Sequence, residues 1–598
     1  MARIHYRLSF PNLHAHLVSV EARFIDAAAD GPEVDLKMAA WTPGSYMIRE
    51  YSRHVQDLVA SDEDGRSIDV VKVDKATWRA RMTHGRDLVV RYRVFGHELT
   101  VRTNHVDGTH AFLNGAPTFL WVEKRKEEPA LVEIEAPPGF HVATSLDLVD
   151  GTYLAANLDE LIDSPIHVGP SPALEFSAAG RTARLALWGR FDMGKGVVRD
   201  ARGPDELLAQ LVADTQSIME AHARVFGGVP YEHYTFLLLL SPGAYGGLEH
   251  KRSTALLASP FAFASRKQYE ELLELISHEY FHLWNVKRIR PSVLGPFAYD
   301  REAYTRSLWV MEGVTSTYDR LTLRRAGVLP AKRFFEKLCE EWSKLLAIPG
   351  RKKQSLEESS LDAWIKLYRP DENSVNSTVS YYLKGGLVAT CLDLDIRLRT
   401  EGERSLDDVL RHLWRRYGEA PQGFKDADVQ REFEEATGLD LGDFFDRFVR
   451  GREDPDLEGA LAKVGLALKA SYEREGGEET DDVPPAWLGV NTQGDGRVVV
   501  ASTLSESPAE RHGLYAGDQI VAVDGFRVDD RTLAKRILSR RPGDSVRLTL
   551  FRRDELFEIN VVLGERPRDR FEIAPAEAPS EDQRARYAAW MGEDLPLS

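Results

Sequence analysis

The string H-E-Y-F-H at residues 278–282 places the tightest constraint on what this chain can fold into. His278 and His282 are four residues apart, so they share one face only if the segment is helical. Two imidazoles in that arrangement can hold one Zn²⁺, and Glu279 between them can reach a water molecule beside the metal. An S-x-x-Q capping pattern begins at Ser265, and apolar residues then recur at helical spacing. The local sequence therefore predicts the helix that the motif needs.

A catalytic zinc site uses three protein ligands and keeps a fourth position for water, so a third ligand must come from elsewhere. Glu312, in the string W-V-M-E-G, is the candidate, because helical periodicity from Tyr304 to Leu323 places it on the inner face of a second helix. A basic last turn and then Ala326-Gly327 mark the end of that helix. Glu302 is the rival ligand, but its polar neighbours are typical of a helix start. We expect one zinc ion per chain, with three ligands: His278, His282 and Glu312.

Length and charge limit the remaining possibilities. A chain of 598 residues exceeds one hydrophobic core, and its net charge of −17 argues against nucleic acid or an anionic membrane surface as the main partner. We interpret the two cysteines, Cys339 and Cys391, as buried thiols because both fall in helix-like apolar segments. No apolar run is long enough to span a membrane. The N-terminus has no signal-peptide pattern, so we expect a cytoplasmic protein unless an export signal has been removed.

Hydrophobic periodicity predicts a multidomain α+β protein. Residues 1–180 indicate a β domain, because alternating apolar runs are separated by Asp-Gly and Pro-Gly turns. Residues 181–476 indicate a mainly helical domain, and an acidic, Gly- and Pro-containing linker follows. Residues 484–567 form a further unit, and residues 568–598 a charged tail that we expect to be loosely ordered. The long helices expected in the second domain are Asp205–Phe226, Ala331–Ala347, Val379–Thr400 and Asp426–Val449.

Two segments of the first domain carry side chains that could act chemically. Trp41–Tyr46 is turn-rich and aromatic, with Arg49 shortly after it, and we interpret it as a structural corner. His105 and His110 fall in a polar loop. Because no spaced acidic partner accompanies them, we interpret these two residues as solvated histidines and not as metal ligands.

The unit at residues 484–567 carries a recognisable string, G-L-Y-A-G-D-Q-I-V-A-V-D-G at residues 513–525, after Trp487-Leu488-Gly489-Val490. It resembles the PDZ domain of bacterial proteases. The resemblance implies that Leu488, Gly489 and Val490 lie in the loop whose backbone N–H groups bind a peptide C-terminus. A purely structural PDZ-like module is the alternative.

The motif at His278–Pro291, H-E-Y-F-H-L-W-N-V-K-R-I-R-P, and the later W-V-M-E-G resemble the glycyl aminopeptidase family of zinc metallopeptidases. Those enzymes combine an N-terminal β domain, a thermolysin-like catalytic domain and a C-terminal PDZ domain. The resemblance implies the same architecture here, from Trp41–Tyr46 to Gly525. In the related aminopeptidase N group the second histidine and the third ligand are closer in sequence than the 29 residues between His282 and Glu312. A longer inter-helix loop would account for the difference.

Two further strings resemble the aminopeptidase N group. Gly246-Gly247-Leu248-Glu249 is similar to the segment that lies along the substrate, where glycines let the substrate backbone approach and a glutamate binds its free α-amino group. His250 replaces an asparagine of those relatives, so its role is open. Tyr382, in Y-L-K-G, is similar to the tyrosine that donates to the oxyanion, and the adjacent Tyr381 is the alternative donor.

The resemblance implies a zinc aminopeptidase that removes small N-terminal residues, Gly or Ala, from peptides. Glu279 would be the general base and Tyr382 the oxyanion donor, with Glu249 as the amine anchor. Two alternatives stay open: a zinc endopeptidase that uses the PDZ module to bind its substrate, and a non-catalytic scaffold whose working part is the PDZ module. The expected partners are peptides, as substrates and as C-termini in the PDZ groove.

Overall fold

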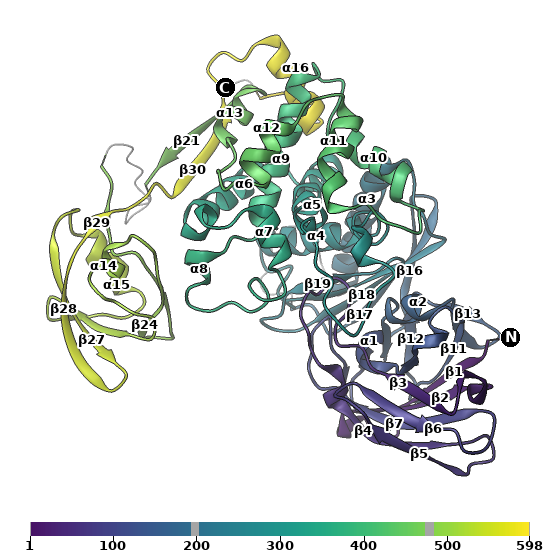
Figure 1. The fold of residues 1–598 in the computed structure, drawn as a ribbon. Coiled ribbons are helices and arrows are strands. Elements are labelled where there is room, and N and C mark those ends of the chain that lie inside the picture. Colours follow the sequence, from purple (N-terminus) through teal and green to yellow (C-terminus); the bar gives the residue numbers. More distant parts are fainter. Residues whose placement is uncertain (1, 193–202, 473–482, 597–598) are drawn as a thin grey trace. The chain divides into compact units, whose positions relative to one another are not determined.

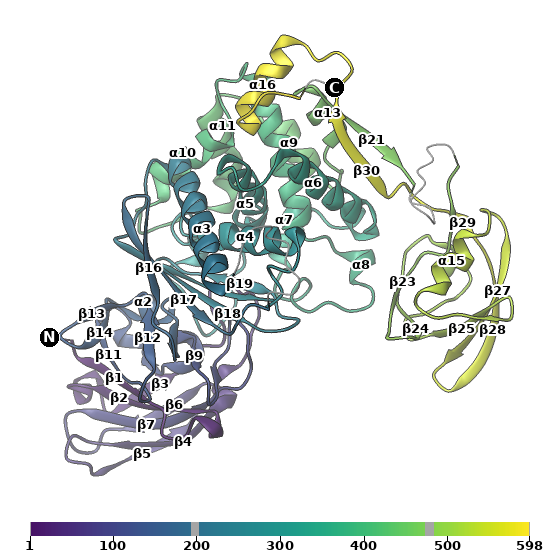
Figure 2. The same cartoon turned by 180° about the vertical axis from the view of Figure 1, so that it is seen from behind.

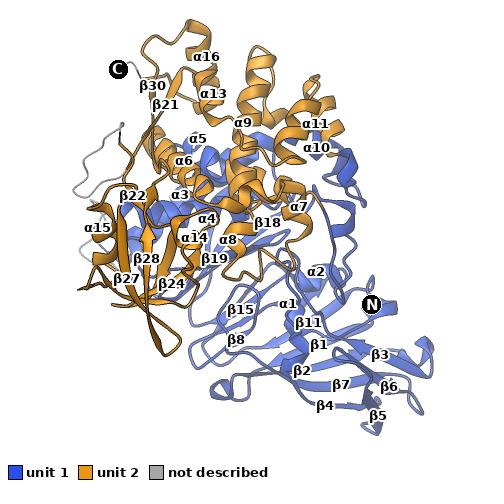
Figure 3. Ribbon diagram, turned by 60° about the vertical axis from the view of Figure 1, so that its left-hand side comes forward, with its two compact units in different colours: residues 1–305, 318–328, 410–428 blue, residues 306–317, 329–409, 429–598 orange. Residues whose placement is uncertain are grey.

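The computed structural model describes residues 2–192, 203–472 and 483–596. Residues 476–482 of the expected linker, 476–485, lie outside the described residues. The chain forms two compact units (Figure 3): residues 1–305, 318–328 and 410–428 in unit 1, and residues 306–317, 329–409 and 429–598 in unit 2. Helix α5 (Val314–Arg325) runs continuously across the boundary between the two sets of residues.

The N-terminal part of unit 1 is a β domain, as the turn-separated apolar runs predict (Figure 1). Its larger sheet has 11 strands, among them β1 (Ile4–Ser9), β2 (Leu17–Phe24), β7 (Leu88–Phe95) and β11 (Ala130–Glu135). Side chains alternate between a buried apolar face and the surface, which is the period of a strand with one covered face. A smaller sheet contains β12 (His141–Thr144), β15 (Ile166–Gly169), β9 (Ala111–Leu113) and β8 (His105–Val106).

A five-stranded sheet follows in unit 1, and it begins with β16 (Leu174–Ala178) and β17 (Arg181–Trp188). Its strand order is β16-β17-β18-β20-β19. Its central strand β18 (His233–Leu240) is buried along most of its length, as its continuous apolar run predicts. Strand β19 (Gly246–Glu249) pairs antiparallel with β20 (Ser253–Ala258) and lies at the edge of the sheet. Helix α4 (Arg266–Phe281) contacts both strands and also helix α3 (Pro204–Phe226). The helix with the H-E-Y-F-H motif therefore packs against an edge strand.

Most of the expected helices of unit 2 form close to their predicted bounds, including α6 (Ala331–Leu346) and α9 (Leu383–Arg399). The prediction of a single helix at 426–449 is wrong. Helix α11 (Val429–Thr437) stops where Gly438 adopts a φ of +74°, and a π-helical turn follows later, at Phe445–Val449. A left-handed glycine ends a helix because it cannot continue the right-handed backbone.

The C-terminal region contains a β sheet of the PDZ type. Its strands are β23 (Val490–Gln493), β24 (Val498–Thr503), β25 (Gln519–Val523), β27 (Ser545–Arg552) and β28 (Glu555–Val562), with β26 (Phe526–Arg527) beside β25. Strand β23 lies at one edge of this sheet. The region has its own apolar core around Val500, Ile520 and Leu548.

The described part of the tail, residues 568–596, contains a strand and a helix, contrary to the expectation of loose order from its charged composition. Strand β30 (Arg570–Pro575) pairs with β21 (Leu466–Ser471), and Figure 2 shows the two side by side. Helix α16 (Glu581–Met591) begins with a capping box and buries Trp590 beside the ring of Phe334. The burial of two aromatic side chains, Tyr587 and Trp590, stabilises this segment although its composition is charged.

His105 and His110 are buried, with 7% and 0% of their surface exposed, so the expectation of solvated histidines is wrong. They flank the turn between β8 and β9. Burial, and then the neighbouring His167, lower the pKa of His110 to about 3. The ring is therefore neutral at neutral pH.

Two other expectations concern cysteines and membrane spans. Cys339 and Cys391 are buried and free, which confirms that interpretation, and burial raises the pKa of both thiols to about 12. Within the described part of the chain, none of the helices is long and apolar enough to cross a membrane.

Burial of another histidine, His222, predicts that stability falls in mild acid. Its Nε2 donates to Ser277 Oγ at 2.8 Å, and burial lowers its pKa to about 3. Between pH 6.5 and about 3 the unfolded chain binds one more proton at this residue than the folded chain does, so the free energy of unfolding falls as the pH falls. We expect the unfolding temperature of His222→Gln to depend less on pH over this range than that of the wild type. The same substitution at the exposed His141 is the control, and equal pH slopes in all three proteins would contradict the assignment.

Candidate metal centre

Helix α4 presents the first two expected ligands. Ser265 caps it, because its hydroxyl accepts a hydrogen bond from the Gln268 backbone N–H at 3.2 Å. The Gln268 side chain accepts from the same hydroxyl at 2.9 Å and not from the Ser265 backbone, so only half of the expected capping box forms. His282 is the C-cap residue and keeps helical backbone angles. The rings of His278 and His282 accordingly lie close together, edge to face, with centroids 4.6 Å apart.

Each of these two rings has a partner on Nδ1. His278 Nδ1 lies 3.1 Å from Asp319 Oδ2, and His282 Nδ1 lies 2.8 Å from the Asn285 carbonyl oxygen. Both partners are acceptors, so Nδ1 of each ring carries the proton and Nε2 keeps its lone pair. A zinc-binding histidine is arranged in this way, with a carboxylate or carbonyl on its far nitrogen. The donor set on α4 therefore fits a zinc ion.

Edge strand β19 touches the glutamate of the motif. A Cβ atom on Gly247 would lie 2.1 Å from Glu279 Oε1, so the strand backbone contacts this carboxylate directly. Glu249, Glu279 and His282 each offer a ligand atom, and these three atoms lie within 4.8 Å of one another. The expected amine anchor, the expected base and one expected zinc ligand are thus brought together within unit 1.

The carboxylate of Glu249 is buried, with 4% of the residue's surface exposed. Its Oε1 has no hydrogen-bond partner among the described residues. A Cβ atom on Gly44 would lie 2.5 Å from both carboxylate oxygens, so the Trp41–Tyr46 segment lies against this residue and is more than a structural corner. A buried carboxylate oxygen without a hydrogen-bond partner is costly, so this geometry favours a bound cation.

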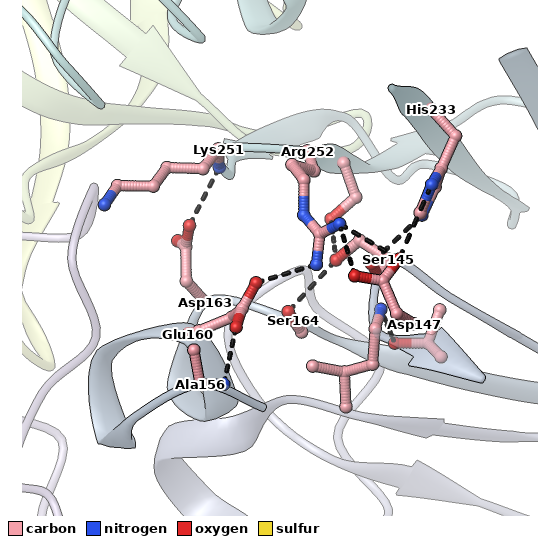
Figure 4. Close-up of polar contacts among 12 residues, drawn as sticks. Ser145, Asp147, Ala156, Glu160, Asp163, Ser164, His233, Lys251 and Arg252 are labelled. Atoms are coloured by element: carbon pink, nitrogen blue, oxygen red, sulfur yellow. Dashed lines mark hydrogen bonds and ion pairs between the residues drawn. The ribbon is translucent and has the colours of Figure 1, made fainter. Parts of the chain in front are cut away.

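The strands next to Glu249 are fixed to the N-terminal β domain by ion pairs (Figure 4). Arg252, just before β20, lies 3.1 Å from Asp147 and 2.7 Å from Glu160. The neighbouring Lys251 backbone N–H donates to Asp163 at 2.8 Å. The turn between β19 and β20 is held at two points as a result.

His250, whose role the sequence left open, strengthens this attachment. Its Nδ1 lies 3.0 Å from Asp163 Oδ1, and Lys287 Nζ lies 2.6 Å from the same oxygen. Burial acts to raise the pKa of Asp163, but the Lys287 ammonium and His250 outweigh it and hold that pKa well below its usual range. His250 therefore anchors the end of β19 that carries Glu249.

In unit 2, Glu312 lies in a buried π-helical turn, Trp309–Gly313. A Cβ atom on Gly313 would lie 2.6 Å from Gly385 Cα, so this turn packs backbone to backbone against the start of α9. Burial, and then the charge of nearby Glu312, raise the pKa of Tyr382 well above its usual value. The close approach of the two glycines thus brings Glu312 and Tyr382 together.

The helix expected from Tyr304 to Leu323 starts later than predicted. Tyr304 is half exposed and outside the helix, and Glu302 does not begin a helical turn. The π-helical turn leads directly into α5, which ends at Arg325 before Gly327, as expected. In sequence, Glu312 precedes Asp319 by seven residues.

Three residues at the site were not found in the sequence. Asp319 could have been found from its helical spacing to Glu312. Gly44 and Arg102, whose guanidinium lies 3.3 Å from the Gly247 carbonyl oxygen, come from the N-terminal β domain. Their distance in sequence from β19 leaves no local signal.

Family models match three parts of the chain. The N-terminal domain of peptidase M61 matches residues 5–170, M61 glycyl aminopeptidase matches residues 271–388, and the PDZ domain matches residues 471–563. The crystal structure of an aminopeptidase N family protein from Idiomarina loihiensis superposes with a TM-score of 0.90 at 30% sequence identity. That alignment covers 98% of this chain and 100% of the other.

Curated relatives match over short regions. A probable periplasmic serine endoprotease, DegP-like, from Brucella suis is 40% identical over 73 residues, which is 12% of this chain and 14% of that protein. A protein of the same description from Rhizobium meliloti is 34% identical over 157 residues, or 31% of its length. The chain therefore spans less than a third of either relative.

Asp319→Ala tests the orientation of His278. Loss of the acceptor on Nδ1 leaves the ring free to rotate, and we expect zinc affinity to fall about 10–100-fold in competition with a chromogenic chelator. Asp319→Asn is the matched control, because its amide oxygen can accept the same hydrogen bond. Wild-type affinity in the alanine variant would show that Asp319 does not orient His278.

Gly247→Ala tests the contact between β19 and α4. The backbone of Gly247 has no left-handed strain, so the new methyl group acts through its overlap with Glu279. We expect a loss of stability of about 1–3 kcal/mol in thermal or urea unfolding. In a Glu279→Ala background the same substitution should cost much less, and an equal cost in both backgrounds would rule out this contact as the cause.

Proposed function

The chain belongs to the M61 glycyl aminopeptidase family and is therefore a zinc peptidase, and on this premise we propose that it is an aminopeptidase that removes Gly or Ala from peptide N-termini. The observation that carries the proposal is the buried Glu249 carboxylate beside Glu279 and His282. An anchor for the substrate's ammonium group at this point selects the first peptide bond of a chain. The preference for a small first residue rests on the family resemblance.

We propose that zinc is held by His278, His282 and Glu312. The two histidines fit because their Nδ1 atoms are already protonated and hydrogen-bonded. Glu312 is the third ligand that the family resemblance implies, and its side chain is buried. When bound there, zinc supplies Lewis acidity that polarises the scissile carbonyl and lowers the pKa of a water molecule.

Glu279 is the proposed general base. Its carboxylate accepts the proton of the attacking water and passes it to the nitrogen of the leaving peptide. The contact of Gly247 with Glu279 Oε1 places this carboxylate at the edge of β19. A substrate that pairs with β19 as an added strand would then carry its scissile bond past the base.

Gly246, Gly247 and Glu249 are proposed to bind the substrate. Gly246 has a φ of +154°, a backbone conformation that favours glycine, and the absence of side chains lets another backbone approach. Glu249 at the end of the strand then forms a charge-assisted hydrogen bond with the substrate's ammonium group. Because β19 is an edge strand, a substrate strand can be added beside it, with Arg102 next to the Gly247 carbonyl oxygen.

Tyr382 is the proposed oxyanion donor. Its raised pKa keeps the phenol protonated at neutral pH, as a hydrogen-bond donor must be. Its proximity to Glu312 favours it over Tyr381, and such a donor is commonly worth about 3–4 kcal/mol of transition-state stabilisation.

We propose that the PDZ groove binds a peptide C-terminus through the backbone of Leu488, Gly489 and Val490. Strand β23, which begins at Val490, is an edge strand and can accept an added strand. Gly489 has a φ of +82°, and its missing side chain leaves room for Ser507.

Glu249→Gln tests the aminopeptidase proposal. The amide keeps the size of the side chain but loses the charge that attracts an ammonium group. We expect kcat/KM for unblocked Gly- and Ala-peptides to fall by a factor that corresponds to about 2–5 kcal/mol. Wild-type protein should not cleave N-acetylated versions of its best substrates. Equal cleavage of acetylated and free peptides would favour the endopeptidase alternative.

Paired variants distinguish the base from the third ligand. Glu279→Gln should keep the wild-type zinc content and lose most turnover, because it removes a proton acceptor and no ligand. Glu312→Gln should lose zinc first. Zinc content by elemental analysis and kcat on the same samples separate the two effects, and equal zinc content in both variants would make Glu302 the next candidate ligand.

A further inference from the structure

A second group of metal-ligating side chains lies in the N-terminal β domain, at the turn between β8 and β9. His105, Asp107 and His110 each offer a ligand atom, and these three atoms lie within 4.8 Å of one another. We propose that this turn is a second transition-metal site that binds Zn²⁺, in addition to the site on α4. The proposal is independent of the peptidase function.

The spacing of the two imidazoles suits a shared metal ion. His105 Nδ1 and His110 Nε2 are 2.9 Å apart. Two nitrogen ligands at 2.0–2.1 Å from one zinc lie about 3.3 Å apart in tetrahedral geometry, so a small movement of either ring admits the ion. The metal would replace the hydrogen bond that links the rings in its absence.

The turn holds the third ligand in place. Asp107 Oδ1 accepts hydrogen bonds from the Thr109 N–H at 2.7 Å, the Thr109 hydroxyl at 2.6 Å and the His110 N–H at 3.1 Å. The D-G-T-H sequence of the turn therefore positions a carboxylate beside two imidazoles. The carboxylate of Asp107 and the two ring nitrogens form a set of ligands that zinc accepts.

The surroundings indicate a built site. The His110 ring stacks on Trp188 at 3.8 Å, which fixes its orientation. The ring of His167 lies beside that of His110, with centroids 5.6 Å apart, and both side chains are buried.

The proposed ligands lie close to the surface. His97 is exposed, and its ring stacks on His105 at 5.1 Å and on His16 at 3.7 Å. Asp107 is partly exposed at the turn itself.

Metal counting tests the proposal. Metal-free protein is reloaded with Zn²⁺, passed through a desalting column and analysed for zinc per chain. We expect two ions in the wild type, one in Asp107→Asn, one in His278→Ala and none in the double variant. Asp107→Asn keeps the acceptor oxygen of the turn, so the fold should be unchanged, and its peptidase activity should match the wild type. His97→Gln is the matched control and should retain two ions.

Cobalt provides a second readout that needs no variant. Co²⁺ added to metal-free wild type should produce visible absorption that saturates at two equivalents, and at one equivalent in Asp107→Asn. Saturation of the wild type at one equivalent would overturn the proposal. Equal zinc content in Asp107→Asn and the wild type, or loss of the second ion on desalting, would overturn the proposal as well.

Discussion

The contact between the Gly247 backbone and the Glu279 carboxylate is the constraint on which the rest of the site depends. Glu279 is fixed on a helix by the zinc motif, and β19 is fixed at the edge of a sheet by its pairing with β20. Only a residue without a side chain allows both, because a Cβ atom would overlap the carboxylate. This contact sets the position of Glu249 two residues later on the strand, and with it the distance from the proposed amine anchor to the proposed base.

The fold could be predicted from the sequence where the signal is local. The apolar run of β18 and the capping residue of α4 are readable because a few neighbouring residues decide them. The interruption in the segment at 426–449 could not be predicted, because one left-handed glycine, Gly438, ends the helix although the amphipathic periodicity continues. The ordered tail was also missed, because Trp590 is buried against Phe334, more than 250 residues earlier in sequence. Composition cannot report such a contact.

At the site, too, residues with a local sequence signal could be predicted and residues that meet only through the tertiary fold could not. The motif residues could be predicted, because their spacing has a chemical reason, whereas Gly44 and Arg102 meet β19 only through the tertiary fold. For the histidines of the β8–β9 turn, the local sequence led to a wrong prediction. Their polar neighbours in sequence suggested a solvated loop, but Trp188 and His167, from later strands, cover His110. Burial of a turn depends on segments far away in sequence, and the sequence of the turn alone cannot show it.

The two histidine pairs differ in how far they are prepared for a metal ion. On α4 each Nδ1 proton is already bound, by Asp319 or by the Asn285 carbonyl, so the Nε2 lone pairs are oriented before a metal arrives. At the β8–β9 turn the two rings bond to each other, so a metal ion must first break that hydrogen bond. Preorganised ligands lose less free energy on binding. The difference in outer partners therefore assigns the tighter affinity to the pair on α4 and makes the proposed site at the turn the weaker of the two.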